Sequence, residues 1–349
     1  MDNYRKGSAD RAGSFIAAHD KDYQGRLNQE PAYFGQGMSA HEPTAISHYW
    51  ANAHLAPQKF KQFGITDAEQ FFYLYVKKYH ERFPERNIQV ASLGTGNSDM
   101  ESRLARKLLD NNISSFTIVC IDVTASITKI QLGYSRSLDV ADYVFTQAGG
   151  VTAWLPETPC DIVLCNQGLH HVLELESLLA MIKISLVAEG LFLVADIIGK
   201  NGHQLWPEAL GHVEEFWKQL PARYKYNHML KRLELRFTNH DYSTGTLDGV
   251  RSQEILPMLN SLFNYELFIP FANIVPVFVG SPFGYNFNAD SEWDQDFIDR
   301  VHERDEQGIL SGELRPAQLL AALCKEPVQT RLVDPRLTPE FCVRHTSYR

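Results

Sequence analysis

Hydrophobic positions change their spacing near residue 88 of this chain. From there to about residue 197, short apolar runs alternate with longer segments in which apolar residues recur every three or four positions. The short runs predict strands, and the periodic segments predict helices. The expected strands are 89–93, 116–121, 143–145, 161–165 and 191–197, and the expected helices are 99–109, 127–138 and 176–186. This alternation indicates an α/β fold with a doubly wound, mostly parallel sheet and right-handed crossovers.

The N-terminal part and one insertion have different patterns. Residues 1–84 predict a mobile polar segment followed by a helical cap, in which Thr66 and Glu69 form a capping box. The sheet is expected within a core spanning residues 85–285. The alternation of strands and helices is interrupted at about residues 200–250, which we expect to form a lid over the core.

The last part of the chain predicts the closing strands and an extension. Apolar runs at 263–269 and 274–279 predict two more strands, the last of them antiparallel, which completes a seven-stranded sheet. Residues 286–349 predict a C-terminal helical extension, with one helix near 290–307 and another that begins at Pro316.

Composition narrows the class of protein. Hydrophobic residues make up 44% of the chain and charged residues 21%, which is typical of a globular protein. A net charge of −9 argues against nucleic acid as a partner, because gripping a phosphate backbone requires cations. No apolar run approaches the length of a membrane span, and the N-terminus has no secretory signal pattern, so we expect no membrane and a cytoplasmic protein. The five scattered cysteines predict free thiols and no metal site. The sequence does not decide the oligomeric state, and a homodimer is one possibility.

A glycine turn is the first candidate for chemistry. Gly94, Thr95 and Gly96 follow a predicted strand and precede a predicted helix, where glycine lets the backbone approach a ligand closely. Ser98 stands where a dinucleotide fingerprint has its third glycine, so a tight turn without a ligand is the alternative. Asp122 ends the next strand and would lie within reach of a ribose diol, although an aspartate there can also cap a helix.

The charge beside this turn helps to choose the cofactor. Asp99 and Glu101 fall in the first turn of the following helix, where they would repel a pyrophosphate. They favour a cationic cofactor without phosphates, although acids at this position also complement the helix dipole.

Four segments carry a resemblance to a known family. In chain order, VASLGTGNS, TIVCID, CDIVLCNQGLHHV and EGLFLVADI resemble the class I, Rossmann-like family of S-adenosylmethionine-dependent methyltransferases over roughly residues 85 to 280. The resemblance implies S-adenosyl-L-methionine as the cofactor and methyl transfer as the activity. It leaves the acceptor open, and we expect a small molecule that is methylated on oxygen, nitrogen or carbon.

The resemblance also implies a set of cofactor-binding residues. They are Gly94, Thr95, Gly96, Asp122, Val123, Gln147, Ala148, Asn166 and Gln167. Asp122 would accept hydrogen bonds from the ribose hydroxyls. Gln147 replaces an acid that the family has near the adenine amine, and an amide oxygen can still accept from that amine. The family commonly has an acid two residues before the first glycine, where this chain has Ser92, and Asp99 is the candidate to supply the missing charge.

Histidines and aromatic residues near the strand ends are candidates for catalysis and substrate binding. His170 and His171 follow the fourth strand, and one of them could act as a general base, although a packing role is equally compatible with the pattern. His203, Trp206 and Tyr226 in the insertion are candidate substrate residues, with the core of a lid as the alternative.

Two other readings of the whole chain remain. It could be another enzyme on the same cofactor scaffold, such as an aminopropyl transferase or an NAD-dependent reductase. It could also be a non-catalytic protein that binds S-adenosylmethionine. Ser92 and Ser98 differ from the residues that the motifs have at these positions, and this supports that alternative.

Overall fold

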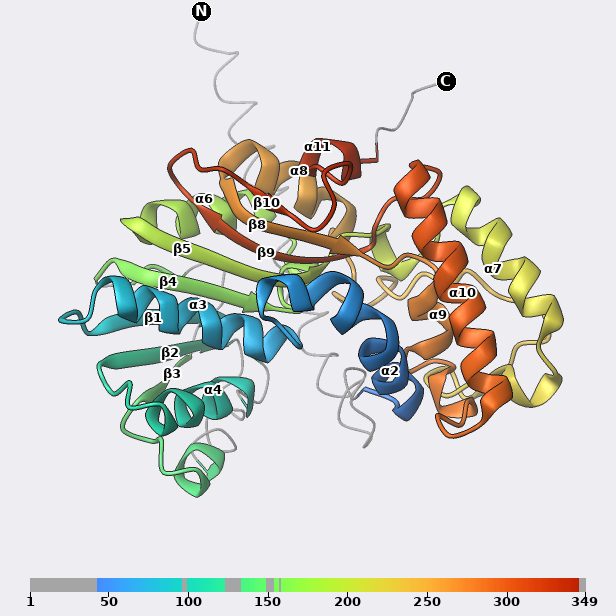
Figure 1. Ribbon diagram of the computed structural model, residues 1–349, viewed down its shortest axis with the longest axis horizontal. Coiled ribbons are helices and arrows are strands. Elements are labelled where there is room, and N and C mark those ends of the chain that lie inside the picture. The colour runs from blue at the N-terminus through green and yellow to red at the C-terminus, as the bar shows by residue number, and fades with distance from the viewer. Residues whose placement is uncertain (1–42, 96–98, 123–132, 149–153, 157, 345–349) are drawn as a thin grey trace, which may run out of the picture.

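The structure is a computed structural model, and it describes residues 43–95, 99–122, 133–148, 154–156 and 158–344 (Figure 1). The elements up to the middle of the chain are α2 (Ala45–Trp50), η1 (Ala51–Phe60), η2 (Lys61–Phe63), α3 (Ala68–Arg82), β1 (Ile88–Leu93), α4 (Asp99–Asp110), β2 (Phe116–Asp122), β3 (Val144–Ala148), β4 (Cys160–Asn166), η4 (Leu169–His171), α6 (Leu175–Ser185) and β5 (Leu186–Ile197). The later elements are η5 (Asn201–His203), α7 (Pro207–Gln219), η6 (Ala222–Tyr224), β6 (Tyr226–Asn227), β7 (Arg232–Leu233), α8 (Ser252–Leu262), β8 (Asn264–Phe271), α9 (Val275–Val279), η7 (Gly284–Asn286), α10 (Glu292–Ser311), β9 (Gln318–Cys324), β10 (Arg331–Leu332) and α11 (Pro339–Cys342).

The main sheet confirms the predicted fold class. Its strand order is β10-β8-β9-β5-β4-β1-β2-β3. Strands β3, β2, β1, β4 and β5 are parallel to their neighbours in this series, whereas β9 is antiparallel to both β5 and β8. The sheet has eight strands where we expected seven, and the two-residue strand β10 forms one edge. The sheet is therefore doubly wound and mostly parallel, with an antiparallel strand near one side.

The parallel strands form because they are buried on both faces. Every residue of β4 except the last is buried, and β1 has one partly exposed residue. Continuous apolar runs of this kind are typical of a parallel sheet covered by helices. In Figure 1, α3 passes in front of the sheet, and α3 contacts α4 on that side.

Two late elements differ from the prediction: an expected strand is a helix, and an expected helix is a strand. Residues 274–279 were expected to be a strand, but Val275–Val279 is the short helix α9, with Pro276 in its first turn. A proline there fits because its missing N–H has no intrahelical partner to lose. The helix expected from Pro316 is also wrong, because Gln318–Cys324 is strand β9. Its leucines and alanines favour a helix in isolation, but a central place in the sheet overrides that preference.

This exchange changes how the last part of the chain relates to the core. The helix expected near 290–307 is present as α10. However, the segment after residue 285 also supplies β9, which pairs with both β5 and β8. Residues 286–349 are therefore not only a helical extension, because part of them is built into the main sheet.

Two predicted helices have slightly different bounds in the structure. Helix α3 begins at Ala68 because the Asp67 carboxylate accepts the Gln70 N–H at 2.8 Å, so the cap lies one residue later than the predicted Thr66. The Thr66 hydroxyl donates to Asp67 instead. Of the helix expected at 127–138, only residues 133–137 are helical within the described part, and 127–132 lie outside it.

The insertion and the last long helix lie beside the sheet. In Figure 1, α7, α9 and α10 group to the right of the strands, with α2 between them and α3. The Trp217 ring of α7 packs against Phe283, with ring centroids 4.8 Å apart, and Phe278 of α9 packs against Phe297 of α10 at 5.4 Å. No helix in the described ranges combines the length and apolar character that crossing a membrane requires.

Candidate functional site

The crevice at the carboxyl ends of β1 and β4 is the expected place for a ligand. Strand β1 lies between β2 and β4, so the order of strands reverses at this point of the sheet. In doubly wound sheets, ligands bind outside the strand ends at such a switch point. The turn after β1 begins at Gly94, which has φ +68° and donates its N–H to Ile121 O at 3.1 Å. This left-handed conformation favours glycine.

The turns after β1 and β4 touch each other. A side chain at Gly94 would meet the Gly168 Cα at 3.3 Å. A Cβ at Gly168 would lie 2.8 Å from Cys165 Sγ and 3.1 Å from Leu93 O, distances too short without local movement. Two glycines therefore allow the backbones of these two turns to approach each other closely.

A buried acid lies beside the glycine turn. Ser92 of β1 donates its hydroxyl to Glu101 Oε1 at 2.6 Å. The other oxygen, Glu101 Oε2, is buried and has no hydrogen-bond partner among the described residues. Burial raises the pKa of Glu101 to about 7, and the hydrogen bond from Ser92 offsets only part of that rise. The acid that contacts Ser92 is therefore Glu101 rather than Asp99, which we expected there.

The other predicted cofactor residues are described to different extents. Gly96 and Val123 lie outside the described residues. For Asp122 and Ala148 only the backbone is described, and the two residues pair at the ends of β2 and β3.

Three further cofactor residues of the prediction lie on strands or just after them. Gln147 is exposed on β3, and Asn166 ends β4. Gln167 has φ +54° and donates its N–H to Ala195 O at 2.8 Å. These residues come from the carboxyl ends of β3 and β4, on the same edge of the sheet as Gly94.

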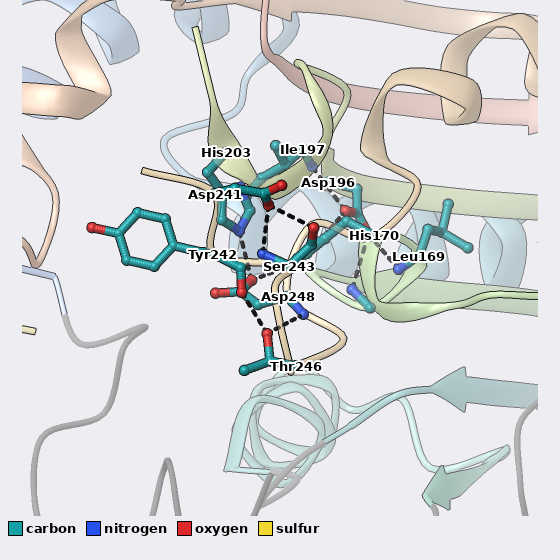
Figure 2. Close-up of polar contacts among 11 residues, drawn as sticks. Leu169, His170, Asp196, Ile197, His203, Asp241, Tyr242, Ser243, Thr246 and Asp248 are labelled. Atoms are coloured by element: carbon teal, nitrogen blue, oxygen red, sulfur yellow. Dashed lines mark hydrogen bonds and ion pairs between the residues drawn. The ribbon is translucent and has the colours of Figure 1, made fainter. Parts of the chain in front are cut away.

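His170 is buried and held by a carboxylate. Its Nδ1 lies 2.6 Å from Asp196 Oδ1, at the end of β5 (Figure 2). The second oxygen of Asp196 accepts the backbone N–H groups of Gly168 and Leu169 at 2.9 and 2.8 Å. Asp196 thus fixes both the turn after β4 and the orientation of the imidazole. The neighbouring His171 ring packs on His170, with centroids 4.0 Å apart.

A second carboxylate links His170 to the insertion. Asp248 Oδ1 lies 3.6 Å from His170 Nε2 and 2.6 Å from His203 Nε2. Figure 2 shows Asp248 between the two imidazoles, with His203 reaching it from the chain after β5. His170 and His203 also contact each other, with ring centroids 5.4 Å apart.

The backbone holds His203 in an uncommon conformation. His203 has φ +55°, and the preceding Gly202 has φ +65°. Gly202 donates its N–H to Gly249 O at 2.8 Å and accepts the Tyr242 N–H at 3.0 Å. The two loops therefore interlock, and their contacts maintain a left-handed histidine that would otherwise be disfavoured. Strain of this kind is often found at functional sites.

Opposite charges determine the protonation of this cluster. Burial acts to lower the pKa of His170, but the nearby Asp196 and Asp248 raise it to about 9. Burial acts to raise the pKa of Asp248, but His203 and His170 hold it well below its ordinary value.

A cavity of about 350 Å³ opens beside this cluster. His203 and Asp248 contribute polar atoms to its wall, whereas His170 and His171 are not among the described residues that line it. Most of the wall is apolar, and its larger apolar residues include Leu205, Trp206, Met229, Phe237, Val277 and Phe283. A cavity with this lining fits a largely apolar small molecule that carries a polar group.

The predicted substrate residues separate into two groups. His203 and Trp206 lie in the cavity wall. Tyr226 is 39% exposed on β6 and packs against the His228 ring, and it is not among the described residues of the wall.

Three acids of the site were not predicted in these roles. Asp196 ends a strand, and the same reasoning that selected Asp122 could have selected it. Glu101 was noted only for its charge. Asp248 lies in an irregular loop, where no local sequence signal marks it.

Comparisons with known proteins give remote matches. No protein-family model matches the chain, and no curated protein matches it. Geranyl diphosphate C-methyltransferase from Streptomyces coelicolor A3(2) is 8% identical, with a TM-score of 0.38 over 68% of this chain and 70% of its own. A putative O-methyltransferase from Nostoc punctiforme PCC 73102 is 20% identical, with a TM-score of 0.32 over 54% and 53%. The 4+2 cyclase SpnF is 11% identical, with a TM-score of 0.40 over 74% and 82%.

The strand arrangement of the chain itself is more specific than these matches. The order from β3 to β8 places the first strand at the switch point and inserts the antiparallel β9 before the last parallel strand. By this arrangement the chain has a doubly wound, Rossmann-like α/β fold, as the sequence predicted.

Proposed function

We propose that the chain is an S-adenosyl-L-methionine-dependent methyltransferase that acts on a small molecule held in the cavity beside His203. The contact between the Gly94 and Gly168 turns at the switch point, with buried Glu101 beside it, carries this proposal. The assignment of the cofactor residues extends the resemblance seen in the sequence.

The chemistry of the crevice suits this cofactor. S-adenosyl-L-methionine has an ammonium and a sulfonium group and no phosphate, so an acid near the helix N-terminus attracts it, whereas a pyrophosphate is repelled. Glu101 Oε2 is buried and has no hydrogen-bond partner among the described residues, so a cationic group bound near this turn would stabilise the ionised form of Glu101. When bound, the cofactor would supply an electrophilic methyl group.

The chain's own residues would position the reactants. Asp122 would accept from the ribose hydroxyls, Gln147 from the adenine amine, and Asn166 would lie beside the methionine part. On the acceptor side, His203 and Trp206 line the cavity. Holding two reactants in line provides much of the rate of a displacement reaction.

The structure changes the role that we propose for the histidine pair. His170 is fully buried and bonded to Asp196, so it is a positioning residue for the turn and for Asp248. His171 packs on His170 and would support the same arrangement. The imidazole that faces an acceptor in the cavity is that of His203.

A cytoplasmic site of action is part of the proposal. The five cysteines form no disulfide in the structure, and free thiols are usual in a reducing compartment. The net charge of −9 supports a small-molecule substrate rather than nucleic acid.

Calorimetry with S-adenosylhomocysteine tests the proposed cofactor. We expect measurable binding by the unmodified chain and an affinity at least about tenfold lower for Asp122→Ala, because a pair of hydrogen bonds to a charged group contributes more than about 1.4 kcal/mol. Asp110→Ala is a matched control, because Asp110 is exposed at the far end of α4 and pairs with Arg106 one turn earlier. Stabilisation by NAD alone, or equal affinity in the Asp122 variant, would contradict the proposal.

A further inference from the structure

Three potential metal ligands converge at the wall of the cavity. They are His170, His203 and Asp248, and one ligand atom from each lies within 4.8 Å of the other two. They come from the turn after β4, from the segment after β5 and from the loop before α8, so only the folded chain brings them together (Figure 2). We propose that these three residues form a binding site for a divalent transition-metal ion.

The buried histidine provides an independent reason for this proposal. His170 Nε2 is inaccessible to solvent, points toward Asp248, and has no hydrogen-bond partner within the described part of the chain. Its nearest acceptor, Asp248 Oδ1 at 3.6 Å, lies beyond hydrogen-bond distance, and an ion bound between the two atoms would satisfy this buried nitrogen. The other nitrogen of the ring is held by Asp196 at 2.6 Å. A carboxylate on the far nitrogen is the usual support of a metal-binding histidine, because it fixes the ring orientation and increases its basicity.

The distances need little adjustment to admit an ion. Bonds of about 2.1 Å at tetrahedral or octahedral angles place neighbouring ligand atoms about 3.0–3.4 Å apart. Asp248 Oδ1 is 3.6 Å from His170 Nε2 and 2.6 Å from His203 Nε2. Binding of an ion therefore requires the His203 ring to move away from Asp248 by less than about 1 Å and the two histidine nitrogens, which lie within 4.8 Å of each other, to approach ligand spacing. Its side chain is 24% exposed toward the cavity, which leaves room for this movement.

The set of donor atoms selects the class of ion. Two imidazole nitrogens and one carboxylate oxygen suit Zn²⁺ or Fe²⁺, whereas Mg²⁺ and Ca²⁺ prefer oxygen ligands alone. Three protein ligands leave coordination positions open, as in catalytic metal sites. His203 and Asp248 lie in the cavity wall, so the open positions face the cavity.

An ion at this place also narrows the substrate class, a step that rests on the proposed function. The cavity wall is largely apolar, and the ion would attract an oxygen ligand. The substrate is therefore a mainly apolar small molecule with an oxygen donor, such as a carboxylate, an enolate or a phenolate, which the ion orients. The metal site itself is independent of methyl transfer.

Titration of the metal-free full-length chain with Zn²⁺ tests the site. Calorimetry should show one Zn²⁺ bound per chain, with affinity at least tenfold lower in His203→Asn and in Asp248→Asn. Asparagine suits position 203 because it tolerates a left-handed backbone but lacks the imidazole. His240→Gln is the matched control, because His240 lines the same cavity outside the ligand cluster, and its affinity for Zn²⁺ should be unchanged.

Each alternative outcome contradicts the site. Absence of Zn²⁺ binding, undiminished affinity in both variants, or displacement of Zn²⁺ by equimolar Mg²⁺ would overturn the proposal. Circular dichroism and thermal unfolding without metal establish that each variant is folded, and partly exposed position 203 provides the test if Asp248→Asn does not fold. Binding of S-adenosylhomocysteine, measured on the same samples, separates a failure of the metal site from a failure of the proposed function.

Discussion

At the scale of single residues, Glu101 combines a structural cost with a proposed role. It is 2% exposed, and only one of its carboxyl oxygens has a hydrogen-bond partner among the described residues. Its pKa is raised by burial to about 7. A fully buried acid of this kind destabilises the folded state when it ionises, and such residues are often kept for function.

The first prediction follows from the sign of that shift. A carboxyl with a raised pKa binds its proton more tightly in the folded chain than in the unfolded chain. The free energy of unfolding therefore falls as the pH rises from 4.5, the ordinary pKa of the group, to about 7, its pKa in the folded chain. This shift corresponds to about 3 kcal/mol as an upper bound. Glu101→Gln should flatten the dependence and stabilise the chain by about 1 kcal/mol or more at pH 8. Urea unfolding at pH 5 and pH 8 measures both effects.

The same variant separates stability from binding. Because the amide introduced by Glu101→Gln carries no charge, affinity for S-adenosylhomocysteine should fall even though the chain becomes more stable. Glu85→Gln removes an equal charge from an exposed position and should change neither quantity. A Glu101→Gln chain that binds as tightly as the unmodified one would exclude this acid from the cofactor site.

At the residue scale, the sequence predicted where the candidate site residues lie in the fold, because they follow strand ends. The glycine turn and the residues after β4 lie on the expected edge because parallel strands share that edge. The sequence suggested Asp99 as the acid that replaces the missing charge at Ser92, whereas the acid in contact with Ser92 is Glu101. Which side chain of α4 faces β1 depends on how the helix packs against the strand, and the sequence does not show this. Asp248 could not be predicted, since it is 45 residues from its partner His203 and lies in irregular structure.

At the scale of elements, a single carboxylate joins α10 to the start of α9. Asp305 accepts the backbone N–H groups of Asn273, Ile274 and Val275 at 2.8, 3.1 and 3.1 Å. These groups begin a short helix, where N–H donors have no partners within the helix. The helix α9 therefore depends on an acid from a distant part of the chain, which explains why its own sequence resembles a strand.

The second prediction tests this contact. Asp305→Ala leaves three backbone donors without their acceptor, and we expect a loss of about 3 kcal/mol in the free energy of unfolding. Asp296→Ala on the same helix removes an exposed ion pair with Arg300 and should cost less than about 0.5 kcal/mol. Chemical unfolding at one pH compares the two. Equal losses of unfolding free energy in the two variants would show that the contact between Asp305 and α9 does not stabilise the fold.

At the scale of the whole molecule, the parallel central strands of the sheet could be predicted from the sequence, whereas the antiparallel strand β9 could not. Parallel strands buried on both faces have long apolar runs that stand out in the sequence. β9 has the composition of a helix, and it is a strand only because β5 and β8 provide hydrogen-bonding partners on both sides. Local pattern cannot reveal a partner so far away along the chain.

The third prediction concerns the two ends of that last segment. A chain that stops at residue 316 lacks β9 and loses the ladders to β5 and β8, so we expect it to be insoluble or unfolded. A chain that stops at residue 344 keeps every described helix and strand and should unfold at the same temperature as the chain of 349 residues. Circular dichroism and thermal unfolding distinguish the two, and a folded chain ending at residue 316 would contradict the role of β9.

The place of β9 also determines the order in which the chain can fold during synthesis. β5 and β8 leave the ribosome before β9, so each exposes an open hydrogen-bonding edge until the later strand arrives. Such edges can pair with other chains, and pairing across a large sequence separation is slow. We therefore expect a late folding step in which nascent chains need chaperones, and this step should set the yield of soluble protein more strongly than equilibrium stability does.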